Sequence, residues 1–140
     1  MRWRYVRLVA KIMKPIDVKS AEFEGHIGTS GIVFVDFWAA WCGPCRMFAP
    51  IFEAAAEKHT DIKFLKVDTD AEQELAGAAQ ITSIPTLMAF RDGILVYRES
   101  GALPGPQFEQ LIEGVRGIDM EEVRKELAKQ AAATKTDSGL

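Results

Sequence analysis

Cys42 and Cys45 are the only cysteines in a chain of 140 residues, and a Gly-Pro pair separates them. Two thiols this close can form a structural staple, half of a metal site, or a redox couple that opens and closes in turn. Structural zinc sites normally need four ligands. There is no second cysteine pair, and His26 and His59 are sixteen residues before Cys42 and fourteen after Cys45. We therefore favour a redox couple over a metal site or two ordinary core thiols, and expect no metal.

The segments around the cysteines predict a strand that leads into a helix. Residues 32–38, IVFVDFW, are apolar on both faces apart from Asp36, which is typical of a strand buried in the middle of a sheet. Residues 45–59 repeat apolar side chains at every fourth position, which predicts a helix that begins at about the cysteine pair. Pro50 is inside this helix and should kink it.

The remaining pattern alternates strands with helices, and Asp92-Gly93 is a strong hairpin signal. The order predicts an α/β fold with a central mixed sheet and helices on both faces. The further elements expected are a short strand and helix in 15–28, strands at 62–67, 86–91 and 94–100, a helix capped by Asp70, and a last helix from near Pro106.

The position of the cysteines assigns them different roles. Only the thiolate attacks a disulfide, and the amides and dipole of a helix N-terminus stabilise a thiolate, so we expect a lowered pKa for Cys42 and assign it as the nucleophile. Cys45, one helical turn deeper, is the resolving thiol that releases the substrate. Gly43 and Pro44 stiffen the turn between them and keep the two sulfurs close.

Asp36 is the only ionisable side chain of the buried strand, and it is our candidate general acid/base. Burial among apolar neighbours should raise the pKa of its carboxyl towards neutrality, where it can exchange a proton with Cys45. The alternative is a structural carboxylate at the strand edge that caps a helix or pairs with a cation.

Three motifs in order resemble the thioredoxin family: VDFWAAWCGPCRMFAP, SIPTLMAFRDG and GALPGPQFEQLI. The resemblance runs from about Met13 to Gly117. It implies a thioredoxin fold and a protein-disulfide reductase that cycles a Cys42–Cys45 disulfide without a bound cofactor. It also implies that a thioredoxin reductase, a flavoprotein, supplies electrons from NADPH.

The resemblance also implies roles for residues outside the cysteine motif. Pro85 corresponds to the family's cis-proline, and Ile84 to the backbone edge that pairs with a substrate. Trp41 matches the indole beside the nucleophile, while Gly101 and Ala102 match small residues that line the substrate groove. The supporting positions are Trp38 beneath the acid, Lys66 near the acid, and Pro50 at the helix kink. The alternatives are a trans Pro85, a solvated Lys66, and a Trp38 that belongs to the core.

Pro44 indicates the direction of electron flow. Relatives that oxidise proteins usually carry a histidine before the second cysteine, which makes the disulfide more oxidising. Pro44 in that place resembles the reductases. The expected compartment is the reducing cytoplasm, and the expected partners are disulfide-containing client proteins and the reductase, with the chain acting as a monomer.

Charge narrows the possible partners further. Residues 15–118 carry eight Lys or Arg against fifteen Asp or Glu, a charge of −7, which disfavours binding to nucleic acid. Residues 1–14 carry five basic residues and no acid, but their apolar stretch is too short for a signal peptide. No segment is long and apolar enough to predict membrane insertion.

We expect three regions along the chain: a basic arm at 1–12, disordered or weakly helical, a thioredoxin domain at 13–117, and a C-terminal part at 118–140. In the last part, Asp119 and Glu122 form a capping-box pattern that predicts a further helix, and residues 131–140 are expected to be disordered. An alternative to the reductase is a binding module whose surface around Trp41 docks partner chains, with redox chemistry secondary.

Overall fold

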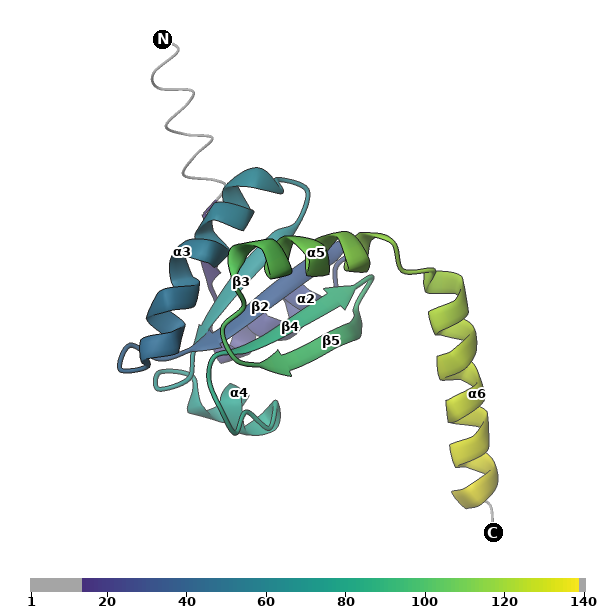
Figure 1. Cartoon of the computed structure of the whole chain (residues 1–140). Coiled ribbons are helices and arrows are strands. Elements are labelled where there is room, and N and C mark those ends of the chain that lie inside the picture. The colour runs from purple at the N-terminus through teal and green to yellow at the C-terminus, as the bar shows by residue number, and fades with distance from the viewer. Residues whose placement is uncertain (1–13, 139–140) are drawn as a thin grey trace.

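The computed structural model describes residues 14–138, with side-chain environments up to residue 134, so the basic arm at 1–12 lies outside the described residues. The elements in chain order are β1 (Ile16–Asp17), the 3-10 helix η1 (Ser20–Glu22), α2 (Phe23–Ile27), β2 (Ile32–Trp38), α3 (Gly43–Lys58), β3 (Lys63–Asp68), α4 (Gln73–Ala78), β4 (Thr86–Arg91), β5 (Ile94–Ser100), α5 (Gly105–Arg116) and α6 (Met120–Ser138). Figure 1 shows their arrangement.

Strand β2 is the centre of a five-stranded mixed sheet with the order β1-β3-β2-β4-β5. It pairs in parallel with β3 and antiparallel with β4, and β4 pairs antiparallel with β5. Residues 33–37 of β2 are all buried, as the apolar sequence on both faces predicts. The α/β fold class with a mixed sheet and helices on both faces is confirmed.

Helices cover both faces of this sheet, α3 and α5 on one and α2 and α4 on the other. In Figure 1, α5 crosses in front of the strands and α2 lies behind them. Five phenylalanine rings fill the first face, with centroids 5.3–6.4 Å apart and several edge-to-face contacts: Phe34, Phe48, Phe52, Phe64 and Phe108. This packing holds α3, and with it the cysteine pair, firmly against the end of β2.

The predicted hairpin and last helix of the domain are present. Asp92 and Gly93 both have positive φ, 53° and 81°, as a two-residue turn between β4 and β5 requires. The apolar face of α5 is buried through Phe108, Ile112 and Val115. The predicted strand at 62–67 is also present, one residue later, as β3.

The predicted role of Asp70 as a helix cap is wrong. Helix α4 begins at Gln73, its N-cap is Glu72, and it has no side-chain capping bond. Asp68 instead accepts hydrogen bonds from the backbone N–H groups of Asp70 and Ala71, at 3.0 and 3.3 Å, which turns the chain before the helix begins. The carboxylate of Asp70 is therefore left free to bind elsewhere.

The predicted disorder is wrong for residues 131–138, because α6 continues through Ser138, while residues 139–140 lie outside the described residues. The predicted cap is present: Asp119 Oδ1 accepts hydrogen bonds from the N–H groups of Glu121 and Glu122, at 3.1 and 3.3 Å. Helix α6 extends away from the sheet in Figure 1. Met120 in its first turn is buried, whereas residues 124–134 are exposed.

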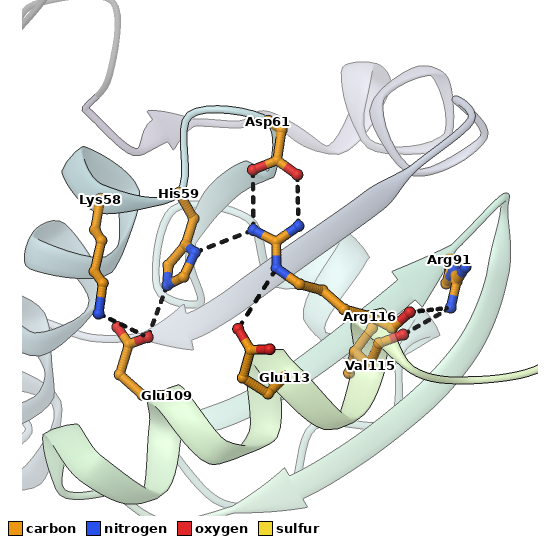
Figure 2. A network of polar contacts seen from close by, with 8 residues as sticks. All are labelled: Lys58, His59, Asp61, Arg91, Glu109, Glu113, Val115 and Arg116. Carbon is orange, nitrogen blue, oxygen red and sulfur yellow. Dashed lines mark hydrogen bonds and ion pairs between the residues drawn. The ribbon is translucent and has the colours of Figure 1, made fainter.

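A polar network ties α5 to the end of α3 and the loop before β3 (Figure 2). Arg116 on α5 donates two hydrogen bonds to the Asp61 carboxylate, at 2.6 and 2.9 Å, and its Nη2 lies 3.1 Å from His59 Nδ1. The other ring nitrogen of His59 lies 2.7 Å from Glu109 on α5. The helix that completes the Phe-rich face is thus held at two points along its length.

Candidate active site

The cysteine pair lies where the chain leaves the central strand and begins α3. Cys42 is the N-cap of α3, with extended backbone, and its Sγ accepts a hydrogen bond from Cys45 N–H at 3.2 Å. The two residues form a disulfide, with Cα atoms 5.2 Å apart. Gly43 and Pro44 make the first turn of the helix, and Pro44 is exposed beside the sulfurs. An N–H directed at Cys42 Sγ is positioned to stabilise a thiolate on that atom once the disulfide opens.

The loop before β4 is the second wall of the site. The Ile84–Pro85 peptide bond is cis, as the resemblance implied, and Ile84 O lies 3.7 Å from Cys42 Sγ. Pro85 O accepts a hydrogen bond from Gly101 N–H at 2.8 Å, which places the start of the loop after β5 beside Pro85. Gly101 has φ of 110°, a conformation that favours glycine, and the next residue, Ala102, is exposed.

Asp36 is fully buried on β2, and among the described residues neither of its carboxylate oxygens has a hydrogen-bond partner. Burial raises the pKa of Asp36 from its usual value near 3.8 to about 7, against the opposing charge of Lys66. At neutral pH this carboxyl is therefore divided between its protonated and ionised forms. A group in that state can both accept and donate a proton.

Lys66 and Trp38 lie next to Asp36 in different ways. Lys66 is the register partner of Asp36 on the parallel strand β3, and its ammonium lies 4.7 Å from the centroid of the Trp38 ring. Trp38 packs against the small cluster of Ala39 and the two cysteines. Its buried Nε1 has no hydrogen-bond partner within the part of the chain that the structure describes.

Trp41 precedes the nucleophile position and is 68% exposed, unusually open for an indole. Its Nε1 donates a hydrogen bond to Asp70 Oδ2 at 3.0 Å, so the ring is anchored although it is exposed. This contact is not predicted from the sequence, in which the position of Asp70 favours a helix cap. The pattern that could have revealed it is the run of acids directly after β3, at the same sheet edge as the end of β2.

Among the predicted site residues, Trp38 and Ile84 pack against the cluster of Ala39 and the two cysteines, whereas Pro50 lies further along α3. Pro50 is inside α3, at the groove between α3 and α5. It contributes to the course of the helix and not to the surface around Cys42. Among the described residues no group of three or more His, Cys, Asp or Glu side chains is placed to hold a metal, and no helix is long and apolar enough to cross a membrane.

A mixed sheet whose central strand ends in a Cys-Gly-Pro-Cys helix start, with a cis-proline loop against the first cysteine, defines a thiol-disulfide oxidoreductase. Comparison with known proteins agrees with this class. The family model for thioredoxin matches residues 14–114. This chain belongs to the thioredoxin family.

Individual relatives cover most of the chain. A thioredoxin homologue of Streptomyces coelicolor is 44% identical over 117 residues, which are 84% of this chain and 87% of the relative. The thioredoxin of Mycoplasmoides gallisepticum is 40% identical over 101 residues, 72% of this chain and all of the relative. A solved thioredoxin mutant from Halobacterium salinarum superposes with a TM-score of 0.70 at 34% identity, over 76% of this chain and 95% of that one.

Proposed function

We propose that this chain reduces disulfide bonds in client proteins, with Cys42 as the attacking thiol and Cys45 as the resolving thiol. The observation that carries the proposal is the placement of Cys42 Sγ. It accepts the Cys45 N–H at the start of α3 and lies against the carbonyl of Ile84. The sulfur thus has a donor that favours its thiolate, and it faces a backbone edge that an extended client segment can pair with.

The reaction balances as two successive exchanges. The Cys42 thiolate attacks one client sulfur, forms a Cys42–client disulfide, and displaces the other client sulfur as a thiolate, which takes up a proton. Cys45 then loses its proton and attacks Cys42 Sγ, so that the Cys42–Cys45 disulfide forms and the second client sulfur leaves. Two electrons pass to the client, which ends as a dithiol, and this chain ends as the disulfide that the structure contains.

Asp36 takes the proton that Cys45 must lose. Its pKa of about 7 leaves much of it ionised at neutral pH, and its full burial keeps the carboxyl away from bulk water. Lys66 adjusts this pKa from the neighbouring strand. The client chain lies on a surface formed by Trp41, Ile84, Pro85, Gly101 and Ala102.

The cycle closes when a flavoprotein thioredoxin reductase returns two electrons, drawn from NADPH, and two protons to the disulfide. The chain works as a monomer in the cytoplasm, where glutathione and similar thiols keep client disulfides rare and reducible. The excess of acids in residues 15–118 supports protein partners over nucleic acid.

The test is insulin reduction by the full chain with dithiothreitol as the electron source, together with two single variants. Cys42→Ser should abolish turnover. Cys45→Ser should still attack but accumulate covalent client adducts that excess dithiothreitol releases, visible by mass spectrometry. Equal adduct yields from the two variants would overturn the assigned roles. Client binding that survives loss of both thiols, with no turnover in the parent chain, would support the docking-module alternative instead.

A further inference from the structure

A pocket of about 400 Å³ opens beside the disulfide, and the proposed reaction leaves it unused. One wall is the indole of Trp41, and the facing wall comes from the loop that leads to the cis-proline. The lining residues used below are Trp41, Thr69, Gln73, Ala76, Ile81 and Ile84. Its volume is in the range of pockets that take small ligands, so a single client side chain fits within it.

The position of the pocket links it to the attacked cysteine. Trp41 is the residue before Cys42, and Ile84 places its carbonyl 3.7 Å from Cys42 Sγ. A client segment that pairs with the Ile84 edge while its sulfur meets Cys42 must pass along the mouth of the pocket. A side chain close to the attacked cysteine is therefore the natural occupant.

The lining of the pocket mixes apolar side chains with uncharged polar ones, Thr69, Gln73, Thr82 and Ser83, and a negatively charged carboxylate is bound to one of its residues. Trp41, Ile81, Ile84 and Ala76 present ring and aliphatic surface, and none of the lining side chains is ionisable. The Asp70 carboxylate is hydrogen-bonded to the edge of the Trp41 ring at 3.0 Å. This arrangement suits a side chain with an aliphatic stem and a cationic end, which can lie on the indole and reach the carboxylate.

The nearby cations do not compete for this carboxylate in the structure. Arg46 donates to Ala40 O at 3.0 Å, and Arg98 donates to Ala79 O and Gln80 O at 2.6 and 2.7 Å. Both guanidinium groups are thus engaged with backbone carbonyls, and neither lines the pocket.

We propose that the pocket beside Trp41 binds an arginine or lysine side chain of the client, close in its sequence to the cysteine that Cys42 attacks. The inference rests on the proposed function and deepens it: the chain prefers disulfides with a basic neighbour. Trp41 supplies the platform, and Asp70 supplies both the anchor of that platform and the charge.

The experiment uses the reduced full chain and a set of disulfide-linked peptides that differ at one position beside the attacked cysteine: arginine, lysine, leucine or glutamate. Rate constants for peptide reduction are measured at low and high salt. We expect the arginine and lysine peptides to react roughly fivefold faster than the leucine peptide at low salt, with the glutamate peptide slowest. The differences should shrink at high salt.

Two variants locate the effect. Asp70→Asn keeps an acceptor for Trp41 Nε1 but removes the charge, so the ratio of the rates for the basic peptides to the rate for the leucine peptide should fall from about fivefold to about one. Glu57→Gln removes an acid near the far end of α3 and should keep the preference. Its exposed side chain makes it the matched control.

The failures of the two proposals are distinguishable. Equal rates for all four peptides, or a preference that survives Asp70→Asn, would overturn the pocket assignment while the reductase function stands. A chain that reduces neither these peptides nor insulin would overturn the proposed function and the inference with it.

Discussion

Two opposing effects set the pKa of Asp36 and therefore the pH at which this buried carboxyl becomes charged. Burial without a hydrogen-bond partner in the described structure raises its pKa to about 7, and the positive charge of Lys66 works in the opposite direction. An uncompensated buried charge destabilises the fold, so this residue is retained at a cost. The destabilisation can be measured as the free energy of unfolding, and the proposed proton transfer can be measured separately as turnover.

Replacing Asp36 with asparagine should raise the stability of the protein above neutral pH and lower its rate of disulfide reduction. The folded state holds the Asp36 proton more tightly than the unfolded chain does. The ionised carboxyl therefore does not lower the free energy of unfolding below about pH 4, lowers it increasingly as pH rises, and has its full effect above about pH 7. Three pKa units correspond to at most about 4 kcal/mol. Urea unfolding at pH 4.5 and pH 8 should show a much larger gain at the higher pH.

Turnover of the same variant in the insulin assay should fall, because Cys45 loses its proton acceptor. Glu53→Gln, an exposed change on α3, is the control and should alter neither quantity. An asparagine variant with full activity from pH 6 to 8 would show that the carboxyl is not a proton acceptor.

Lys66→Met should shift the pH dependence of turnover towards higher pH. Because the Lys66 charge lowers the pKa of Asp36, its removal lets that pKa rise above about 7 and keeps the carboxyl protonated further into the alkaline range. The measurement is the insulin-reduction rate from pH 6 to 9. Lys63→Met, on the same strand but bound to His26 O and Thr29, should leave the profile in place.

The sequence indicates the candidate reactive residues because their signals are local. Cys42 and Cys45 are separated by two residues, and Asp36 interrupts an otherwise apolar run, so each is visible without knowledge of the fold. The partner of Trp41 is not visible in this way. Asp70 lies 29 residues further along the chain and meets the indole only because β2 and β3 run in parallel to the same edge.

The helices and strands show the same division between local and distant signals. The buried strand β2, the hairpin at Asp92-Gly93 and the amphipathic α5 follow from periodicity and turn chemistry. The network of Figure 2 does not, because His59 and Arg116 are 57 residues apart. The prediction of disorder after residue 130 rests on composition near the end of the sequence, but alanine-rich sequence favours helix, and α6 continues through Ser138.

Arg116→Met should lower the stability of the fold in a pH-dependent way. The hydrogen bonds from Arg116 hold the pKa of Asp61 well below its usual range, at about 2, so this pair stabilises the folded state above about pH 4 and loses its effect as pH falls towards 2. The Asp61 side chain is largely exposed, which limits the expected loss at pH 7 to about 1 kcal/mol.

Urea unfolding at pH 7 and pH 2.5 checks this, and the difference between variant and parent should be smaller at the lower pH. Lys125→Met is the matched control, because its ion pair with Glu122 is exposed within α6. A loss that is equal at both pH values would mean that Arg116 acts through packing alone.

In the molecule as a whole, the catalytic apparatus and its supporting core are confined to the sheet and the helices up to α5. Among the side chains that the structure describes, α6 has one buried residue, Met120 in its first turn, and Arg124 forms an ion pair with Asp92 of the domain at 3.3 Å. Further along, residues 125–134 are exposed. This distribution supports our proposal of a thioredoxin domain at 13–117 with peripheral segments on either side.

Truncation tests that division of the chain. A chain of residues 13–140 should keep both the melting temperature and the insulin-reduction rate of the full chain. A chain of residues 13–117 should keep the rate within about twofold, because no site residue is lost. It should melt a few degrees lower, because it loses buried Met120 and the Ile118 carbonyl that accepts a hydrogen bond from Arg91 at 2.7 Å.

A chain of residues 13–124 is the matched intermediate, since it retains Ile118, Met120 and the Arg124–Asp92 pair while lacking most of α6. Its melting temperature, followed by circular dichroism, should equal that of the full chain, because exposed helix contributes little to the stability of the domain. If its insulin-reduction rate fell by tenfold, the distal part of α6 would have to act on clients. If the chain of residues 13–140 already melted several degrees below the full chain, the basic arm would have to pack on the domain and be counted as part of it.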